Sequence, residues 1–227
     1  MQSVKIVAVS KPTISDPITG YIVGVDEFIA YVARVSNPSN QMNTQTAPKL
    51  LKYLAKHKHW SPFEMVSICM EIDTTRDIAR QILRHRSFSF QEFSQRYDDP
   101  TKDLGFVTRE ARLQDMKNRQ NSIETDDDDL QMQWENVQKC VKASAEDAYK
   151  WAIENGVAKE QARAVLPEGL TQSRMYMNGT LRSWIHYCEL RMGVETQKEH
   201  REIASLAWDE IIKIFPSLTD VLQQDTK

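Results

Sequence analysis

The chain has 227 residues, of which 41% are hydrophobic and 27% are charged, and its formal net charge is -3. This length supports one sizeable domain with a substantial core, and the weak acidic balance argues against general binding to nucleic acid or anionic membranes. Residues 1–20 lack a signal-peptide pattern, and no apolar run is long enough to span a bilayer. We therefore expect a cytoplasmic protein in which residues 1–227 form a single domain.

The three cysteines are widely spaced and form no C-x-x-C pair that could bind a metal or exchange disulfides. This predicts reduced thiols, in keeping with a cytoplasmic setting. None of Cys69, Cys140 and Cys188 has the sequence context of a catalytic nucleophile. Cys188 falls on an apolar helix face, where a buried, unreactive thiol is expected.

The first third of the chain predicts two strands separated by two helices. Residues 5–10 alternate as in a strand, and residues 65–72 are rich in hydrophobic side chains. Apolar residues at helical spacing predict helices over 26–35 and from Thr46 onward. Between these elements the prolines and glycines of residues 11–24 indicate a loop.

Two histidines and an acid, His57, His59 and Glu64, lie before the second strand. An H-x-H pair with a distant glutamate is a weak metal pattern, so we expect ordinary hydrogen-bonded or surface histidines and no metal. A metal-dependent hydrolase is the alternative, and loss of activity to a chelator would support it.

A short helix is predicted between Thr74 or Thr75, either of which can cap it, and Arg84. Gln81 and Arg84 are three residues apart and share one face of this helix, so they can reach one ligand together.

The most distinctive segment covers residues 84–97 and reads R-H-R-S-F-S-F-Q-E-F-S-Q-R-Y. Clustered cations repel one another, and guanidinium groups suit forked recognition of phosphate or carboxylate. The S-F-S-F alternation predicts extended chain with one buried face. A salt-bridged surface is the ordinary explanation of such a cluster, but the interleaved aromatic residues favour an anion-binding site.

Residues 98–129 form a charged, loop-rich region that ends in four aspartates. This acidic run lacks the glycine and distal glutamate of an EF-hand, and it precedes a strong helical pattern, so we interpret it as a helix N-terminus. We expect this long helix to end at Asn155-Gly156 and to bury one apolar face, made of Trp134, Val137, Val141, Ala148 and Ala152.

The last third of the chain predicts mainly helices. A short helix over 157–166 places Arg163 away from its apolar side, and Asn178-Gly179-Thr180 is typical of a turn. Thr180 can cap the helix that follows, whose polar face carries Arg182 and His186. A final amphipathic helix is predicted over 195–215.

Segment 84–96 resembles the signature of the flavin-dependent thymidylate synthases, R-H-R-x-x-S-x-N-E-x-S-x-R. Every specified position matches except Gln91, which stands where the family has Asn. The similarity extends from about Ala30 to Pro216, and with Phe88, Gln91 and Phe93 the segment is most similar to viral members. A match with so many specified polar residues is highly specific.

This resemblance implies an α+β fold, with a small, mainly antiparallel sheet, packed helices and a helical C-terminal half. It implies reductive methylation of dUMP to dTMP, with methylene-tetrahydrofolate as carbon donor and NADPH as reductant through bound FAD. It also implies a homotetramer with each site at a subunit junction. The chain has no G-x-G-x-x-G fingerprint, which fits a flavin held between subunits rather than in a Rossmann crevice.

The resemblance also assigns the site residues. For dUMP they are Gln81, Arg84, Glu92, Ser94, Gln95, Arg96, Arg163 and Arg191. For FAD they are His59, Ser61, Arg84, His85, Arg86, Glu92, Thr180, Arg182 and His186. Arg191 is also the expected catalytic residue, because the matching arginine faces the uracil ring and is proposed to stabilise negative charge on it.

Two departures and two alternatives accompany this interpretation. Gln91 replaces Asn within the signature, and Met65 replaces the histidine that usually follows Glu64 in the family.

A module that binds single-stranded nucleic acid through the Arg-aromatic segment is one alternative. A flavin- and nucleotide-binding relative that has lost catalysis is the other.

Overall fold

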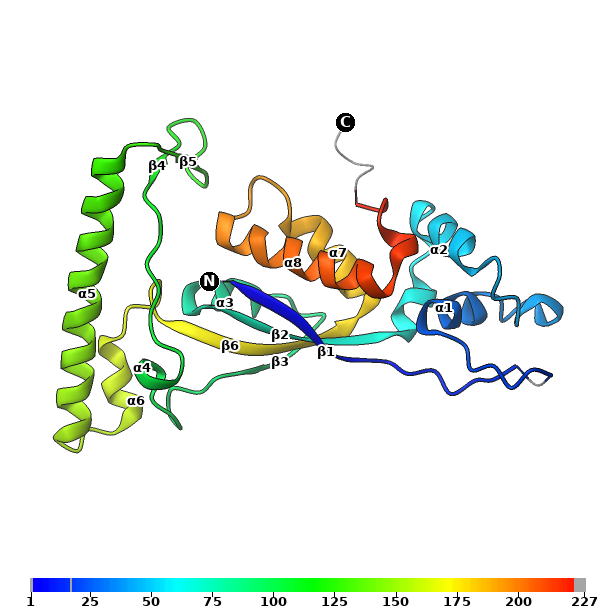
Figure 1. The fold of residues 1–227 in the computed structure, drawn as a ribbon, viewed down its shortest axis with the longest axis horizontal. Coiled ribbons are helices and arrows are strands. Elements are labelled where there is room, and N and C mark those ends of the chain that lie inside the picture. Colours follow the sequence, from blue (N-terminus) through cyan, green and yellow to red (C-terminus); the bar gives the residue numbers. More distant parts are fainter. Residues whose placement is uncertain (1, 17, 223–227) are drawn as a thin grey trace.

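A four-stranded antiparallel sheet forms the centre of the computed structural model, which describes residues 2–16 and 18–222 (Figure 1). The strand order is β1-β2-β6-β3. The bounds are Ser3–Val9 for β1, Ser67–Thr75 for β2, Ser89–Glu92 for β3 and Gln172–Thr180 for β6. This sheet confirms the expected α+β class with mainly antiparallel pairing.

Helices make up most of the remaining regular structure. They are α1 (Val25–Ala33), α2 (Ala47–Lys56), α3 (Arg76–Ile82), α4 (Pro100–Asp103), α5 (Asp128–Glu154), α6 (Lys159–Ala162), α7 (Leu181–Arg191) and α8 (Lys198–Ile214). A separate hairpin pairs β4 (Arg112–Gln114) with β5 (Ser122–Glu124). Within the described residues, no helix combines the length and the apolar character needed to cross a bilayer.

Strand β6 lies between β2 and β3, and its end corrects the turn predicted over Asn178–Thr180. Gly179 pairs with Ile68 in the ladder, and a Cβ atom on it would lie 2.4 Å from the Phe88 ring. The glycine therefore provides room for a close contact inside a strand, where sequence alone indicated a turn. Thr180 still caps α7 as predicted, because its Oγ1 accepts a hydrogen bond from the Ser183 N–H.

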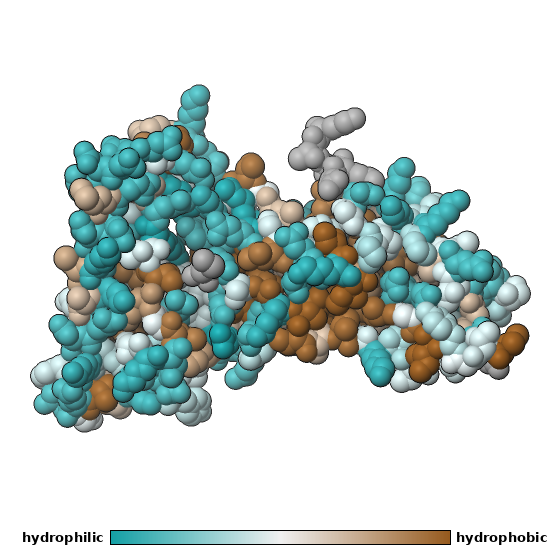
Figure 2. All heavy atoms as spheres, in the orientation of Figure 1, coloured by the Kyte–Doolittle hydropathy of each residue, from teal (hydrophilic) through white to brown (hydrophobic). Residues whose placement is uncertain are grey.

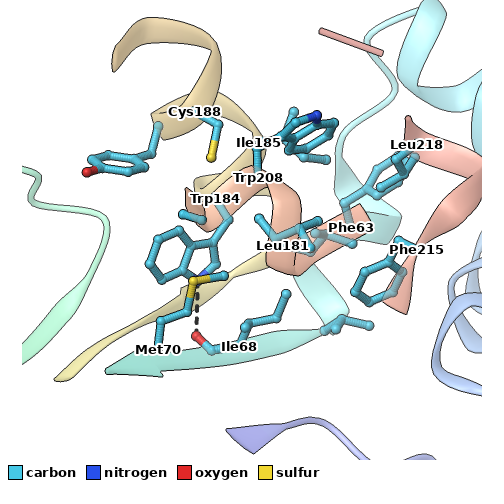
Figure 3. Packing of buried hydrophobic residues seen from close by; sticks show 14 of the residues in the cluster. Phe63, Ile68, Met70, Leu181, Trp184, Ile185, Cys188, Trp208, Phe215 and Leu218 are labelled. Carbon is cyan, nitrogen blue, oxygen red and sulfur yellow. Dashed lines mark hydrogen bonds between the residues drawn. The ribbon is translucent and has the colours of Figure 1, made fainter. Parts of the chain in front are cut away.

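The main core lies between the sheet and the helices that cover one of its faces, α3, α7 and α8. From α7, the buried residues Leu181, Trp184 and Cys188 confirm the apolar face predicted for this helix. The Trp184 indole N–H donates to the Ile68 carbonyl at 3.0 Å, which satisfies its polar atom inside the core (Figure 3). This packing fixes α7 rigidly against β2.

Helix α5 stands at one end of the molecule and packs with α6 through a second, small cluster around Tyr149 and Ala152 (Figure 1). Asp127 caps α5 by accepting from the Leu130 N–H, and Gly156 ends it with a φ of +78°, both as predicted. The predicted buried face holds for Ala152, which is 7% exposed, but it is wrong for Trp134, Val137 and Val141, which are 41%, 53% and 45% exposed. In Figure 2 this end of the molecule carries mainly polar side chains, whereas apolar ones gather over the middle.

Candidate functional site

Polar side chains from α3, α7, α8 and the turn after α3 meet beside the core in a group that we call the histidine cluster. Its members are Gln81, His85, Tyr187, Arg191 and His200. The Arg191 Nε–H donates to His85 Nε2 at 2.9 Å. His200 is fully buried and links Gln81 Oε1, at 3.3 Å from its Nδ1, to the Tyr187 hydroxyl, at 3.1 Å from its Nε2. The sequence analysis predicted Gln81, His85 and Arg191 as site residues, and the fold brings them together.

Both histidines of the cluster are neutral at physiological pH. Burial, followed by the positive charge of Arg191, lowers the pKa of His85 to about 4 and that of His200 to about 3. Because Arg191 donates to Nε2 of His85, the ring proton of His85 must lie on Nδ1. A permanent cation is thus held by a neutral ring, and no other hydrogen bond of the Arg191 side chain is seen within the described residues.

A second group forms an open hollow of about 300 Å³ that we call the arginine pocket. Its lining includes Arg76, Arg80, Gln95 and Arg163. The Gln95 side chain is 5% exposed, and its Nε2 has no hydrogen-bond partner within the described residues. Such a buried donor is costly unless a ligand accepts from it. Three guanidinium groups and a free amide donor make this pocket suited to an oxyanion such as phosphate.

Three further residues predicted for dUMP, Glu92, Ser94 and Arg96, lie beside this pocket. Glu92 lies behind it, accepting from Arg76 Nη1 at 3.2 Å and from the Ser173 hydroxyl at 2.7 Å. Arg96 is exposed and pairs with Glu160, a lining residue, at 3.2 Å. The Ser94 Oγ accepts from the Arg96 backbone N–H at 3.4 Å, so this serine has a local structural role beside the pocket.

A third group lines a cleft of about 930 Å³ along the first turns of α7, which we call the α7 cleft. Its walls include Ser87, Thr180, Arg182 and His186, and Glu64 pairs with Arg182 across it. His59 and Ser61 flank Trp60, which also lines the cleft, and both are exposed. Three of the residues predicted for FAD therefore line one cleft, and two more lie next to its wall.

The structure does not bring every predicted residue into a group. Arg84 and Arg86 are exposed, and no hydrogen bond or ion pair of either side chain is seen within the described residues. Gln81 and Arg191, both predicted for dUMP, do not line the arginine pocket. The residues predicted for dUMP are thus divided between the histidine cluster and the arginine pocket.

The sequence analysis missed four polar residues of these groups. Arg76 and Arg80 precede the signature, and their i, i+4 spacing on α3 was the only signal that they share a face. Tyr187 and His200 come from α7 and α8, and only the fold brings them to Gln81. Within the described residues, no three His, Cys, Asp or Glu side chains form a group that could hold a metal ion.

Comparisons with known proteins identify the family of the chain. Residues 18–217 match the family model described as "Thymidylate synthase complementing protein". A "probable flavin-dependent thymidylate synthase" of Paramecium bursaria Chlorella virus 1 is 47% identical, with 97% of this chain and 98% of the relative covered. A flavin-dependent thymidylate synthase of Synechocystis is 45% identical, with 97% and 99% covered.

A solved structure confirms the fold independently. A UMP/dUMP methylase from Streptomyces cacaoi, determined with bound 5-Br dUMP, superposes with a TM-score of 0.75. Its sequence is 24% identical, and the match covers 96% of this chain and 95% of the methylase. With the family model and the two relatives matching nearly the whole chain, the protein belongs to the flavin-dependent thymidylate synthase family of enzymes.

Proposed function

We propose that the protein catalyses the reductive methylation of dUMP to dTMP, with methylene-tetrahydrofolate as carbon donor and NADPH as reductant through bound FAD. The observation that carries this proposal is the Arg191–His85 pair, in which a neutral ring holds a guanidinium group in place. A cation fixed in this way can stabilise negative charge on a uracil ring and so activate the ring carbon without a covalent cysteine adduct. We further propose that residues 1–227 act as one domain in the cytoplasm.

The thiols fit this role for Arg191. Cys188 is fully buried, and burial raises its pKa far above the ordinary value, so it is not available as a nucleophile. The pKa of Cys69 is also raised by burial. Cys140 is exposed on α5 and lines neither the arginine pocket nor the α7 cleft. Charge stabilisation by Arg191 therefore takes the place of thiolate attack in the proposed reaction.

The arginine pocket suits the phosphate of dUMP. Arg76, Arg80 and Arg163 supply fixed positive charge, and Gln95 supplies a donor that has no partner within the described residues. Phosphate binding would satisfy this donor and add charge-assisted contacts to the arginines, of which Arg76 and Arg80 also pair with Glu92 and Glu168. We propose Arg96 as a further phosphate contact at the edge of the pocket.

The α7 cleft suits the flavin. Its volume accommodates a large part of a dinucleotide, and Arg182 together with the N-terminus of α7 supplies the positive potential that phosphates need. We propose that Ser87, Thr180, Arg182 and His186 hold FAD there, with His59, Ser61, Arg84 and Arg86 on its margins. When bound, FAD supplies the redox chemistry, and the chain binds and orients it.

We also propose a homotetramer in which two chains build each site. The histidine cluster and the arginine pocket hold different parts of the predicted dUMP set and share no residue. The apolar side chains exposed along α5 are surface that a second chain would bury. A base bound at the cluster of one chain could then place its phosphate in the pocket of another.

An anaerobic visible spectrum of the purified protein tests the reaction. We expect a bound-flavin absorption band that bleaches with NADPH and recovers only when dUMP and methylene-tetrahydrofolate are both added. A band that bleaches and never recovers would support the catalytically inactive relative instead. Absence of flavin after reconstitution with FAD would contradict the proposal.

Mixed oligomers test the shared site. At a dUMP concentration far below the raised KM of Arg163→Ala, Arg191→Ala and Arg163→Ala chains should each have little activity alone, because each impairs one half of every site. After co-assembly of equal amounts, about a quarter of the sites should combine two intact halves and regain activity. A mixture no more active than its parts would show that one chain supplies both halves.

A further inference from the structure

A chain of side-chain hydrogen bonds runs from the β4–β5 hairpin into the histidine cluster. Arg112 Nη2 lies 2.5 Å from Glu199 Oε1, and both side chains are only 11% exposed. Gln197 Nε2 donates to Glu199 Oε2 at 2.9 Å, and Gln81 Nε2 donates to Gln197 Oε1 at 2.8 Å. His200 then continues the chain from Gln81 Oε1 to the Tyr187 hydroxyl.

The charge at one end fixes the direction of every bond in this chain. An ionised carboxylate can only accept, so Gln197 must present its Nε2 to Glu199 and its Oε1 to Gln81. Gln81 must then present its Nε2 to Gln197, which turns its Oε1 to His200. That oxygen requires a proton on Nδ1 of His200, and Nε2 is left to accept from the Tyr187 hydroxyl.

The same chain of hydrogen bonds in the opposite direction is unfavourable at one contact only. If both amides and the ring tautomer were inverted, Gln197 Oε1 would face a Glu199 oxygen, and two acceptors would meet in a half-buried site. The carboxylate of Glu199, neutralised by Arg112, therefore selects one of two otherwise equivalent hydrogen-bond patterns. The low pKa of His200, which keeps its ring neutral, allows the ring to act as donor and acceptor together.

We propose that Glu199 is a positioning residue that fixes which edge of the Gln81 amide, nitrogen or oxygen, faces the uracil ring of dUMP. Uracil presents carbonyl acceptors on either side of an N–H donor, so an inverted amide opposes donor to donor and acceptor to acceptor. This inference rests on the proposed function for the identity of the ligand. It also gives Arg112, in the charged region between β3 and α5, a defined role at the site.

Steady-state kinetics of three variants test the proposal. In Glu199→Gln the new amide can donate or accept, so the Gln81 amide loses its single orientation. We expect the KM for dUMP to rise about tenfold, with a smaller fall in kcat and unchanged flavin content, because a mispaired polar contact weakens nucleotide binding. Glu202→Gln, an exposed glutamate on the same helix, is the matched control and should behave as the unmodified chain.

The double variant Gln197→Glu with Glu199→Gln is the decisive comparison. The new carboxylate at position 197 accepts from Gln81 Nε2, while the new amide at position 199 donates to it and accepts from Arg112. The original direction of the Gln81 amide is restored, so the KM for dUMP should return towards that of the unmodified chain. A double variant as impaired as Glu199→Gln, or a Glu199→Gln variant equal to the control, would overturn the proposal.

A direct structural readout is independent of turnover. With ¹⁵N-labelled histidine, and His200→Asn to assign the signal, we expect His200 in the unmodified protein to be neutral and protonated on Nδ1. Glu199→Gln should mix the two tautomers, and the double variant should recover the first. A proton on Nε2 in the unmodified protein would refute the inference even if variants fail to fold. Failure of the spectral test with a correct tautomer would refute the proposed function alone.

Discussion

The histidine cluster and the arginine pocket both gather polar and cationic side chains, yet they are organised in opposite ways. In the cluster, the polar groups pair with one another, the histidines are neutral, and Tyr187 and His200 are fully buried. In the pocket, three arginines face an open hollow and Gln95 keeps an unpaired donor within the described residues. The difference teaches that one group is preorganised for direction-dependent contacts, whereas the other leaves a buried amide donor without a partner in the described part of the chain, beside arginines that pair with Glu92 and Glu168.

Arg191→Ala should have the largest effect, because it removes the one permanent cation of the histidine cluster. We expect kcat to fall by about 10²–10³-fold, the usual loss for a group that stabilises developing charge. Arg191→Lys should remain strongly impaired, because an ammonium group lacks the fixed planar geometry of guanidinium. Single-turnover rates measured with saturating dUMP test this, and a rate unchanged in Arg191→Ala would remove this arginine from the chemistry.

Arg163→Ala should have a smaller effect, on the binding of dUMP and not on the chemical step. The reason is that the arginine pocket supplies positive charge for the phosphate. We expect the KM for dUMP to rise by about 10–100-fold as one charge-assisted contact is lost, with little change in kcat at saturation. Binding of deoxyuridine, which has no phosphate, should be unaffected by the substitution. Equal losses for dUMP and deoxyuridine would show that Arg163 does not act through phosphate.

Acid should destabilise the protein through the histidine cluster. His85 and His200 have folded-state pKa values of about 4 and about 3, below the ordinary value of 6.5. The unfolded chain therefore binds more protons below pH 6.5, and the free energy of unfolding falls as the pH is lowered from 6.5 towards 4. Urea unfolding at several pH values in this range should give a free energy of unfolding that falls steeply as the pH is lowered. His200→Gln should make this fall smaller. The exposed His57→Gln is the control, and equal slopes in both variants would contradict this origin.

Much of the fold was predictable because its signals are local. The acidic run before α5, the Thr180 cap and the apolar face of α7 all depend on residues within a few positions of one another. The β6 strand was missed because Gly179 adapts to Phe88, a contact between distant segments. The helical spacing of the apolar residues on α5 was predicted correctly. Periodicity does not show, however, whether the surface that covers such residues belongs to the same chain.

The site residues likewise fall into those that the sequence could indicate and those that only the fold reveals. The family resemblance, within the signature and beyond it, indicated Gln81, His85 and Arg191, and the fold brings these three together. His200 and Glu199 escaped notice because a histidine and a glutamate on an amphipathic helix are ordinary surface residues until the fold buries them. Hydrogen-bond direction, on which the cluster depends, has no sequence signal, since it arises only when donors and acceptors from α3 and α8 meet.

Gln95→Met should have the smallest effect and separates stability from binding in the arginine pocket. Replacing the amide by an apolar side chain of similar size removes a buried donor that has no partner within the described residues, so the melting temperature without ligand should rise by a few degrees. The same change removes a contact to phosphate, so the affinity for dUMP should fall by roughly tenfold or less. Thermal melts with and without dUMP measure both effects in one protein. Because Gln81 pairs inside the histidine cluster, Gln81→Met should lower the melting temperature instead. If both substitutions shift stability in the same direction, the contrast between a self-paired cluster and a ligand-dependent pocket does not hold.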